Sequence, residues 1–492
     1  MTDTKKPFYI TTTAPYVNAK AHIGFALEIV QADAIARYKR LSGHEVFFNF
    51  GTDEHGQKIY EKAQEAGQDP QSYTDEYAEK FGDLKEALNL TYTKHVRTTD
   101  PHHKKAAQEM WKRCKENGFI EKGVYKAKYC VGCELEKQDS ELEDGKCPLH
   151  PTYDLQLIEE ENYFFKFSKL QKELLKLYND NPNFVIPDHR QKEITNFVEA
   201  GLQDFSISRL KEKMPWGVPV PDDDKHVMYV WFDALTYYIS ALGWPDDEES
   251  FTKFWGTKET PNALQVAGKD NLRQQTSMWQ AMLIAAGLPT SRQVLIHGFI
   301  TSGGQKMSKS TGNVIDPLEY VERYGTDALR YYLLAKISPF EDSDFTQEGF
   351  EQVYQADLAN GLGNLVSRVA AMATKIPDYR FLPNKEHSNS LWNDVSNELN
   401  HFNFNSAINL IWGAIDGTDK YLSAERPWQL DLSDNNQKLS KIVIINTAIE
   451  NILDIAYCLK PFLPETAEKI TEILGKENII KPEKPLFPRL DK

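Results

Sequence analysis

The chain has 492 residues, of which 41% are hydrophobic and 26% charged, a composition typical of globular proteins. A chain of this length is too long for a single hydrophobic core, so we expect several domains. The formal net charge of −15 argues against general nucleic-acid binding, although a local basic face on an acidic protein can still hold RNA. Because residues 1–6 are polar and polar residues interrupt the apolar stretch 442–459, we expect neither a signal peptide nor a membrane span.

The N-terminal part predicts alternating strands and helices. Residues 8–13 are aromatic and β-branched, which indicates a buried strand, and residues 23–41 carry a helical apolar pattern that stops at Gly43. Residues 45–50 predict the next strand, followed by a polar turn and another helical stretch. This order predicts an α/β fold, a doubly wound parallel Rossmann-like sheet that binds ligands at the carboxyl ends of its strands.

Two short motifs follow in a segment that breaks the α/β pattern. Cys130 and Cys133 are three positions apart, as are Cys147 and His150, and 13 residues separate the two pairs. This spacing predicts a tetrahedral zinc site, and since four protein ligands leave no open position the zinc should be structural. Five cysteines are too few for a disulfide scaffold, so we expect a reducing, cytoplasmic location.

The pattern of strands resumes in the second half of the chain. Residues 229–235 predict a strand that ends in a polar turn, and residues 263–267 predict another, followed by Gly268-Lys269-Asp270. Residues 294–300 predict a third strand, which contains His297. We expect the ends of these three strands to converge on one crevice.

A glycine- and lysine-rich stretch comes directly after the last strand. Gly303 and Gly304 permit positive φ and a close approach of the backbone to a ligand. Lys306 and Lys309 stand three positions apart among hydroxyl side chains, which suits a polyphosphate. Residues 306–310 read Lys-Met-Ser-Lys-Ser.

The remainder of the chain predicts helices. Apolar residues recur at helical spacing in 327–335, 352–375, 404–422 and 438–459. We therefore expect an α-helical bundle of about 140 residues at the C-terminal end.

These motifs resemble a known family. Residues 306–310 match the second signature of class I aminoacyl-tRNA synthetases, and Ala21-His22-Ile23-Gly24-Phe25 resembles their HIGH signature, with Phe25 in place of the second histidine. The rest of the chain resembles the methionine–tRNA ligases in particular. The segments that carry this narrower resemblance are Ala14–Asn18, Gly51–Gly56, Trp231–Leu235, the two zinc motifs and His297-Gly298.

The resemblance implies a reaction and its site residues. Methionine and ATP, with Mg²⁺, would form methionyl-adenylate, and the methionyl group would pass to tRNA with a CAU anticodon for initiation and elongation. The implied catalytic residues are His22, Lys306 and Lys309. ATP would be bound by His22, Gly24, Arg209, Gly268, Asp270, Lys306, Ser308 and Lys309. Methionine would be bound by Ala14, Tyr16, Asp53, Trp231, Ala234, Leu235, Tyr238 and His297, with its ammonium at Asp53. The anticodon would be read by Asn364, Arg368 and Trp428.

The expected domains follow from the changes in pattern. They are a catalytic α/β domain at 1–117 and 226–301, an insertion at 118–225 with its zinc knuckle at 127–153, a stem-contact region at 302–350 and an anticodon-binding helical domain at 351–492. Dimeric members of the family typically carry a further C-terminal module, whereas this sequence ends with the helical bundle. We therefore expect a monomer.

Two alternatives stay open. One is a class I ligase for another apolar amino acid, such as leucine or valine, but the insertion of about 110 residues is short for the editing domain that such enzymes need. The other is a non-catalytic zinc- or RNA-binding relative. Phe25 favours that reading, and the intact Lys-Met-Ser-Lys-Ser stretch opposes it.

Overall fold

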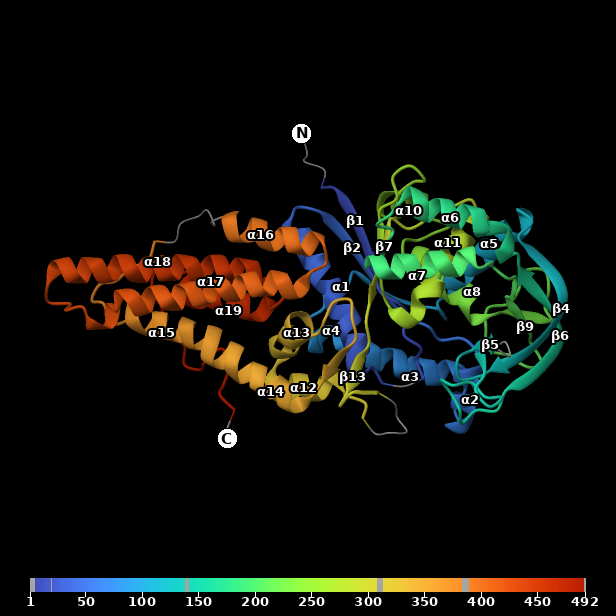
Figure 1. Ribbon diagram of the computed structural model, residues 1–492, viewed down its shortest axis with the longest axis horizontal. Helices are drawn as coiled ribbons and strands as arrows, with labels where there is room; N and C mark the ends of the chain where they lie inside the picture. The colour runs from blue at the N-terminus through green and yellow to red at the C-terminus, as the bar shows by residue number, and fades with distance from the viewer. Residues whose placement is uncertain (1–4, 19, 138–140, 308–312, 383–388, 491–492) are drawn as a thin grey trace. The chain divides into compact units, whose positions relative to one another are not determined.

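The computed structural model describes residues 5–18, 20–137, 141–307, 313–382 and 389–490 (Figure 1). Contacts within the chain define two compact units. Unit 1 comprises Met1–Ala21, Gly43–Lys85 and Tyr92–His297, and unit 2 comprises His22–Ser42, Glu86–Thr91 and Gly298–Lys492. The domain boundaries expected from the sequence stay a prediction.

A parallel sheet of six strands lies at the centre of unit 1. Its order is β3-β2-β1-β11-β12-β7, and every neighbouring pair is parallel. This confirms the doubly wound α/β fold, in which the carboxyl ends of the strands form the binding edge. The strands are β1 Pro7–Thr11, β2 Glu45–Thr52, β3 Lys94–Arg97, β7 Val185–Ile186, β11 Ala263–Gly268 and β12 Gln293–His297.

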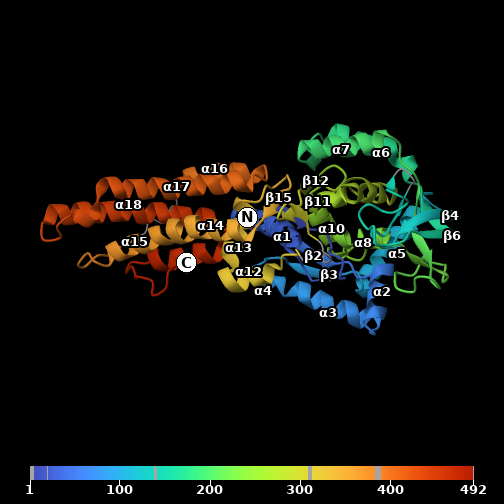
Figure 2. The same cartoon turned by 60° about the horizontal axis from the view of Figure 1, so that its bottom comes forward.

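Helices of unit 1 pack with this sheet around one core. Trp111 of α5, Trp255 of α10 and Trp279 of α11 are fully buried in the same cluster as Tyr9 of β1. Helices α6 and α7 lie side by side in both views (Figures 1 and 2). The helices are α2 Gln57–Glu65, α3 Pro70–Gly82, α5 Pro101–Glu116, α6 Gln171–Asp180, α7 Asp188–Glu199, α9 Tyr237–Ser240, α10 Glu248–Trp255 and α11 Trp279–Ala285. The short helix α4, Leu84–Ala87, spans the division between the units.

The segment with the cysteines forms antiparallel sheets. The long strands β4, Ile120–Cys130, and β6, Gln156–Phe165, pair along most of their length. The sheet order is β5-β4-β6-β8, with β5 at Leu135–Lys137 and β8 at Phe205–Ser206, and β9, Ser208–Leu210, pairs with β10, His226–Met228. Strand β4 thus ends on the first metal-ligand candidate, Cys130.

Two expected strands differ from the observed structure. Residues 229–235 are not a strand, because Val230–Ala234 form a short helix, α8, after β10. A short apolar run with aromatic residues is compatible with a buried helix as well as a buried strand, and here the helical turn buries Asp233. The expected strand 294–300 is two strands, since β12 ends at His297 and β13, Ile300–Ser302, joins another sheet.

Unit 2 is largely helical, as expected. Its small sheet has the order β14-β13-β15, with β14 at Gln305–Lys306 and β15 at Ser343–Phe345. Helices α17 and α18 run side by side in both views (Figures 1 and 2). A π-helical segment, Tyr354–Gly363, joins α14 to α15. The helices are α1 Ile23–Leu41, α12 Pro317–Tyr324, α13 Thr326–Ala335, α14 Gln347–Val353, α15 Asn364–Ala373, α16 Asn389–Asn400, α17 Phe404–Glu425, α18 Asn435–Leu459 and α19 Pro464–Leu474.

Helix α18 is the one described helix whose length and apolar composition would suffice to cross a membrane. Half of its most apolar window is buried, and the helix contacts α15, α17 and α19. Its buried residues, among them Ile445, Ile449 and Ile452, form part of the core of the bundle. A core helix of a soluble bundle has these features.

Candidate functional site

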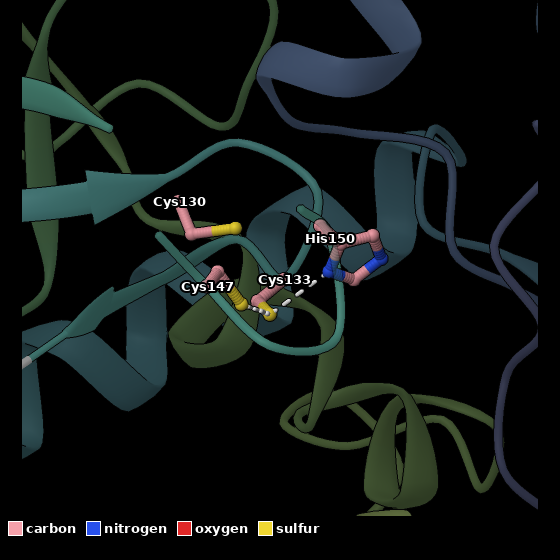
Figure 3. Close-up of side chains that lie close together, drawn as sticks. All are labelled: Cys130, Cys133, Cys147 and His150. Atoms are coloured by element: carbon pink, nitrogen blue, oxygen red, sulfur yellow. Dashed lines mark hydrogen bonds between the residues drawn. The ribbon is translucent and has the colours of Figure 1, made fainter. Parts of the chain in front are cut away.

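A cluster of four metal-ligand side chains confirms the pairing read from the two cysteine motifs (Figure 3). The ligand atoms of Cys130, Cys133, Cys147 and His150 all lie within 4.8 Å of one another. The Cys133 sulfur is 3.4 Å from that of Cys147 and 3.1 Å from Nδ1 of His150. Tetrahedral ligands at zinc bond lengths lie about 3.5 Å apart, so this set of three sulfurs and one nitrogen fits a zinc ion.

Gly132 explains how the two motifs close on each other. A Cβ atom at this position would lie 2.5 Å from Cγ of His150, so only glycine lets the first turn pass the imidazole. The ammonium group of Lys58 is 3.4 Å from the carbonyl oxygen of Gly132, which attaches the turn to the start of α2.

The loop after β2 holds Asp53 through contacts of its neighbours. Glu54 is fully buried and accepts from Arg97 Nε and Nη2 at 2.7 and 2.8 Å, and Thr52 and Thr99 donate to the same carboxylate. The backbone of Asp53 pairs with the segment after β1, because its N–H donates to Pro15 and its carbonyl accepts from Val17.

Asp53 itself has the properties of a cation receptor. Its side chain is buried, and Oδ1 has no hydrogen-bond partner among the described residues. Burial raises the pKa of Asp53 well above its usual range, and the carboxyl groups of Asp233 and Glu134 raise it further. A bound ammonium group would offset both effects.

Asp233, which the sequence motifs left without a role, lies between two histidines. Its Oδ2 is 2.6 Å from Nδ1 of His55 and its Oδ1 is 2.8 Å from Nε2 of His103, while the other nitrogen of His103 is 3.0 Å from Oγ of Ser240. Burial opposes ionisation of Asp233, but the two histidines bring its pKa down to about 2. The group therefore anchors α8 against the loop that carries Asp53.

Two of the expected methionine residues lie on one small apolar cluster. Tyr16 and Trp231 both pack against Tyr129, Val131, Tyr229 and Val230. The hydroxyl of Tyr16 lies 2.8 Å from the carbonyl oxygen of His55, and Nε1 of Trp231 is buried without a partner among the described residues. Aromatic edges of this kind suit a thioether.

Three further expected methionine residues lie in or against the larger core. Leu235 and Tyr238 are buried in it, Ala14 packs against its margin and Ala234 is 6% exposed. The ring of Tyr238 packs against Trp279 at a centroid distance of 5.7 Å. Their contact with an amino acid stays a prediction.

Gly268, Asp270 and His297 meet where β11 and β12 end. Gly268 and His297 are partners in the register of the two strands. A Cβ atom on Gly268 would lie 2.8 Å from Oδ1 of Asp270 and 3.5 Å from Cε1 of His297. The expected convergence of these two strand ends is thus observed, whereas the third expected strand is helix α8.

Arg209 is buried among groups of unit 1. Its guanidinium lies over the rings of Tyr129 and Tyr229 at 5.0 and 4.8 Å, and Nη1 donates to Ser206 and Ser208. These contacts give the side chain a packing role. Its expected contact with ATP stays a prediction.

His22 and Gly24 begin helix α1 in unit 2. Nδ1 of His22 accepts the N–H of Gly24 at 3.1 Å, so the neutral imidazole carries its proton on Nε2, where it can serve a phosphate oxygen. Phe25 is buried in the same turn. The exposed start of a helix is suited to an anion.

The lysine-rich stretch is described only in part. Gly303 and Gly304 have φ of 61° and 73°, which confirms the expected positive φ. Lys306 ends strand β14, and a Cβ on Gly24 would lie 3.9 Å from Cε of Met307. The side chain of Lys306, and Ser308 and Lys309 entirely, lie outside the described residues.

The three anticodon candidates lie on unit 2, and two of them are exposed. Asn364 is exposed at the start of α15, and Arg368 one turn later pairs with Asp419 of α17. Trp428 is 49% exposed, so it is not a core residue. Trp428 lies in the short turn Pro427–Gln429, directly after Arg426, whose backbone is left-handed and ends α17.

A family model for tRNA synthetases class I (M) matches residues 8–154 and 140–370. With the α/β sheet and both signatures, the chain is a class I tRNA synthetase. It is 40% identical to methionine–tRNA ligase of Thermotoga maritima over 98% of this chain and 80% of that protein. The corresponding enzyme of Clostridium acetobutylicum is 42% identical, over 96% of this chain and 74% of that protein. The chain belongs to the methionine–tRNA ligase family.

A solved structure agrees with this assignment. Mycobacterium tuberculosis methionyl-tRNA synthetase in complex with methionyl-adenylate superposes with a TM-score of 0.92 and 33% identity, over 98% of this chain and 100% of that one. The two alternatives, a ligase for another apolar amino acid and a non-catalytic relative, are not favoured.

Proposed function

We propose that the chain attaches methionine to tRNA in two steps, first forming methionyl-adenylate and pyrophosphate from methionine and ATP, then transferring the methionyl group to the terminal adenosine of tRNA. The observation that carries the proposal is the near full-length likeness to a synthetase that holds methionyl-adenylate. Catalysis of this kind depends on positioning and electrostatic stabilisation more than on covalent chemistry.

Methionine binding is assigned to groups of unit 1. The buried carboxylate of Asp53 receives the ammonium group, a charge-assisted pairing that its unpartnered Oδ1 supports. Tyr16 and Trp231 supply aromatic edges to the thioether. The remaining assigned contacts are Ala14, Ala234, Leu235, Tyr238 and His297.

ATP binding is assigned to glycines, a carboxylate and cations. Asp270 accepts hydrogen bonds from the ribose hydroxyls beside Gly268, while His22 and Gly24 face phosphate. Lys306 and Lys309 neutralise the negative charge of the departing pyrophosphate, Ser308 donates a hydrogen bond to it, and Arg209 assists them. Mg²⁺ bound with ATP would supply further positive charge. Phe25 cannot donate a hydrogen bond to phosphate, so the lysines carry more of this stabilisation.

The metal cluster is assigned one structural zinc. Three thiolates and one imidazole complete its coordination, which leaves no position for a substrate. Metal analysis should find about one zinc per chain, and Cys133→Ser should lose it, whereas Cys458→Ser, in a buried position of unit 2, should keep it. Full zinc in the Cys133→Ser protein would refute the assignment.

The RNA partner follows from the reaction. It is a tRNA with a CAU anticodon, which is read by Asn364, Arg368 and Trp428. We further propose that the protein works as a cytoplasmic monomer. Light scattering at micromolar concentration should give a mass of 56.4 kDa. A stable dimer would contradict the monomer.

Methionine-dependent ATP–pyrophosphate exchange tests the proposed function. The purified chain should exchange with methionine and not with leucine or valine. Lys309→Ala should slow exchange by about 10²- to 10³-fold, because its charge acts in the transition state. Lys476→Ala, an exposed lysine in the same unit, is the control. Exchange with leucine, or none with any amino acid, would refute the proposal.

A further inference from the structure

Glu134 directly follows the metal-cluster residue Cys133 and is an unusual buried charge. Its side chain is 5% exposed and its φ is 51°, in the left-handed region. Carboxylates are rarely buried unless their oxygens are paired. Here Oε1 accepts the backbone N–H of Lys58 at 2.9 Å and lies 2.8 Å from the hydroxyl of Tyr16, and Oε2 lies 3.5 Å from the hydroxyl of Tyr129.

One of these contacts caps helix α2 from outside. Gly56 stands at the N-cap of α2 with φ of 109° and has no side chain to accept an N–H of the first turn. Oε1 of Glu134 accepts that of Lys58 instead, and a negative charge at a helix N-terminus is favourable. The start of α2, which follows the Asp53 loop, is therefore fixed to the segment 130–150 that carries the four metal-ligand candidates, called the metal loop below.

The same oxygen holds Tyr16. The single hydroxyl proton of Tyr16 is shared between two acceptors at 2.8 Å, Oε1 of Glu134 and the carbonyl oxygen of His55. A Cβ atom on Gly56 would lie 2.3 Å from this hydroxyl and 3.0 Å from Oε2 of Glu134. The close approach of these groups thus requires the glycine.

Tyr16 in turn adjoins Asp53. The two residues form a parallel backbone bridge, and the N–H groups of Asp53 and Val17 complete it. A displacement of Tyr16 therefore reaches the carboxylate assigned to the ammonium group. The path from Cys133 to Asp53 consists of residues in direct contact.

We propose that Glu134 is a positioning residue for amino-acid recognition, which transmits the geometry of the metal loop to Tyr16 and the Asp53 loop. The inference rests on the proposed function, in which Tyr16 and Asp53 hold methionine. Glu134 does not touch methionine. Its loss should therefore change the KM for methionine and leave the KM for ATP unchanged.

Pyrophosphate exchange of five variants tests this inference, with Tyr16→Phe measured alone as well as combined with Glu134→Ala. Glu134→Ala should raise the KM for methionine about tenfold, as expected when a hydrogen bond to a charged group is lost. Glu134→Gln keeps an oxygen for Lys58 and Tyr16, so it should restore most of the affinity. Tyr16→Phe combined with Glu134→Ala should raise the KM no further than the larger single effect. Glu143→Ala, an exposed carboxylate of the same metal loop, should match the unaltered chain.

Zinc content and melting temperature separate positioning from support of the metal loop. The Glu134→Ala protein should hold the same zinc as the unaltered chain. An unchanged KM for methionine would overturn the inference, as would a loss of zinc with both KM values raised together. If the unaltered chain showed no methionine-dependent exchange, the proposed function itself would fail, which is a separate result.

Discussion

Arg330 and Asp33 form an ion pair of 2.8 Å in which both side chains are fully buried within unit 2. The guanidinium also donates to the carbonyl oxygens of Leu88, Pro461 and Phe462. Burial opposes the charge on Asp33, but Arg330 and Arg37 keep the pKa of this carboxyl below its usual value. Arg330 thus joins helix α1, whose N-cap is His22, to the turn between α18 and α19.

Removal of this guanidinium should destabilise unit 2 strongly. Arg330→Met keeps much of the volume but leaves Asp33 charged, buried and without its main partner, at a cost of about 3–5 kcal/mol. Denaturant unfolding measures this loss. The control is Arg323→Met, because the exposed guanidinium of Arg323 forms a surface pair with the half-buried Glu351 that is worth less than about 1 kcal/mol. Equal losses in the two variants would contradict the assigned role of the buried pair.

The contact between Gly132 and His150 predicts a second effect. Gly132→Ala would place a Cβ 2.5 Å from Cγ of His150, so the imidazole must move away from the sulfurs. Zinc should then be lost to a chelator at a lower concentration than from the unaltered chain. Gly82→Ala, where no atom lies within 4 Å of the added Cβ, is the matched control. Equal retention in both proteins would show that the turn can adjust.

Features set by local pattern were predictable from the sequence. The helix expected at 23–41 has those bounds, because its apolar spacing is long and Gly43 follows it. The four metal-ligand candidates converge since their i, i+3 spacings are local geometry. The strand predicted for residues 229–235 was wrong, because a short buried helix and a short buried strand have the same composition.

Long-range pairings could not be read from the sequence. Asp233 lies 178 positions from His55 and 130 from His103, and no motif links the three. Glu134 stands 118 positions from Tyr16, and its neighbour Cys133 gave no sign that the carboxylate turns inward. Such contacts depend on how the elements pack, which a single sequence does not encode in any local spacing.

The raised pKa of Asp53 predicts a pH dependence of methionine binding. Burial is the main cause of the raised pKa, so the carboxyl becomes neutral at a higher pH than usual and then no longer pairs with the ammonium group. As pH falls below that pKa, the Kd for methionine should rise about tenfold per pH unit, and above it the Kd should be constant. Calorimetric titration at a series of pH values, on both sides of the change, measures this dependence.

The Asp53→Asn variant provides the decisive comparison. Asp53→Asn should bind methionine more weakly at high pH by about 1.5–3 kcal/mol and lose the pH dependence. Asp246→Asn, which changes an exposed carboxylate of the same unit, should behave as the unaltered chain does. A pH dependence that persists in the Asp53→Asn protein would assign the titration to another group.

Trp428 provides the test of anticodon reading. Its indole is 49% exposed, so Trp428→Ala should leave the melting temperature and methionine-dependent pyrophosphate exchange nearly unchanged. Charging of tRNA at subsaturating concentration should fall by about 1–3 kcal/mol, the effect of losing one stacked base. Leu439→Ala, which changes a more exposed apolar residue of α18, is the control for a general loss of surface contacts. If both variants reduced charging alike, or if Trp428→Ala lowered exchange as well, the role of Trp428 in reading the anticodon would be wrong.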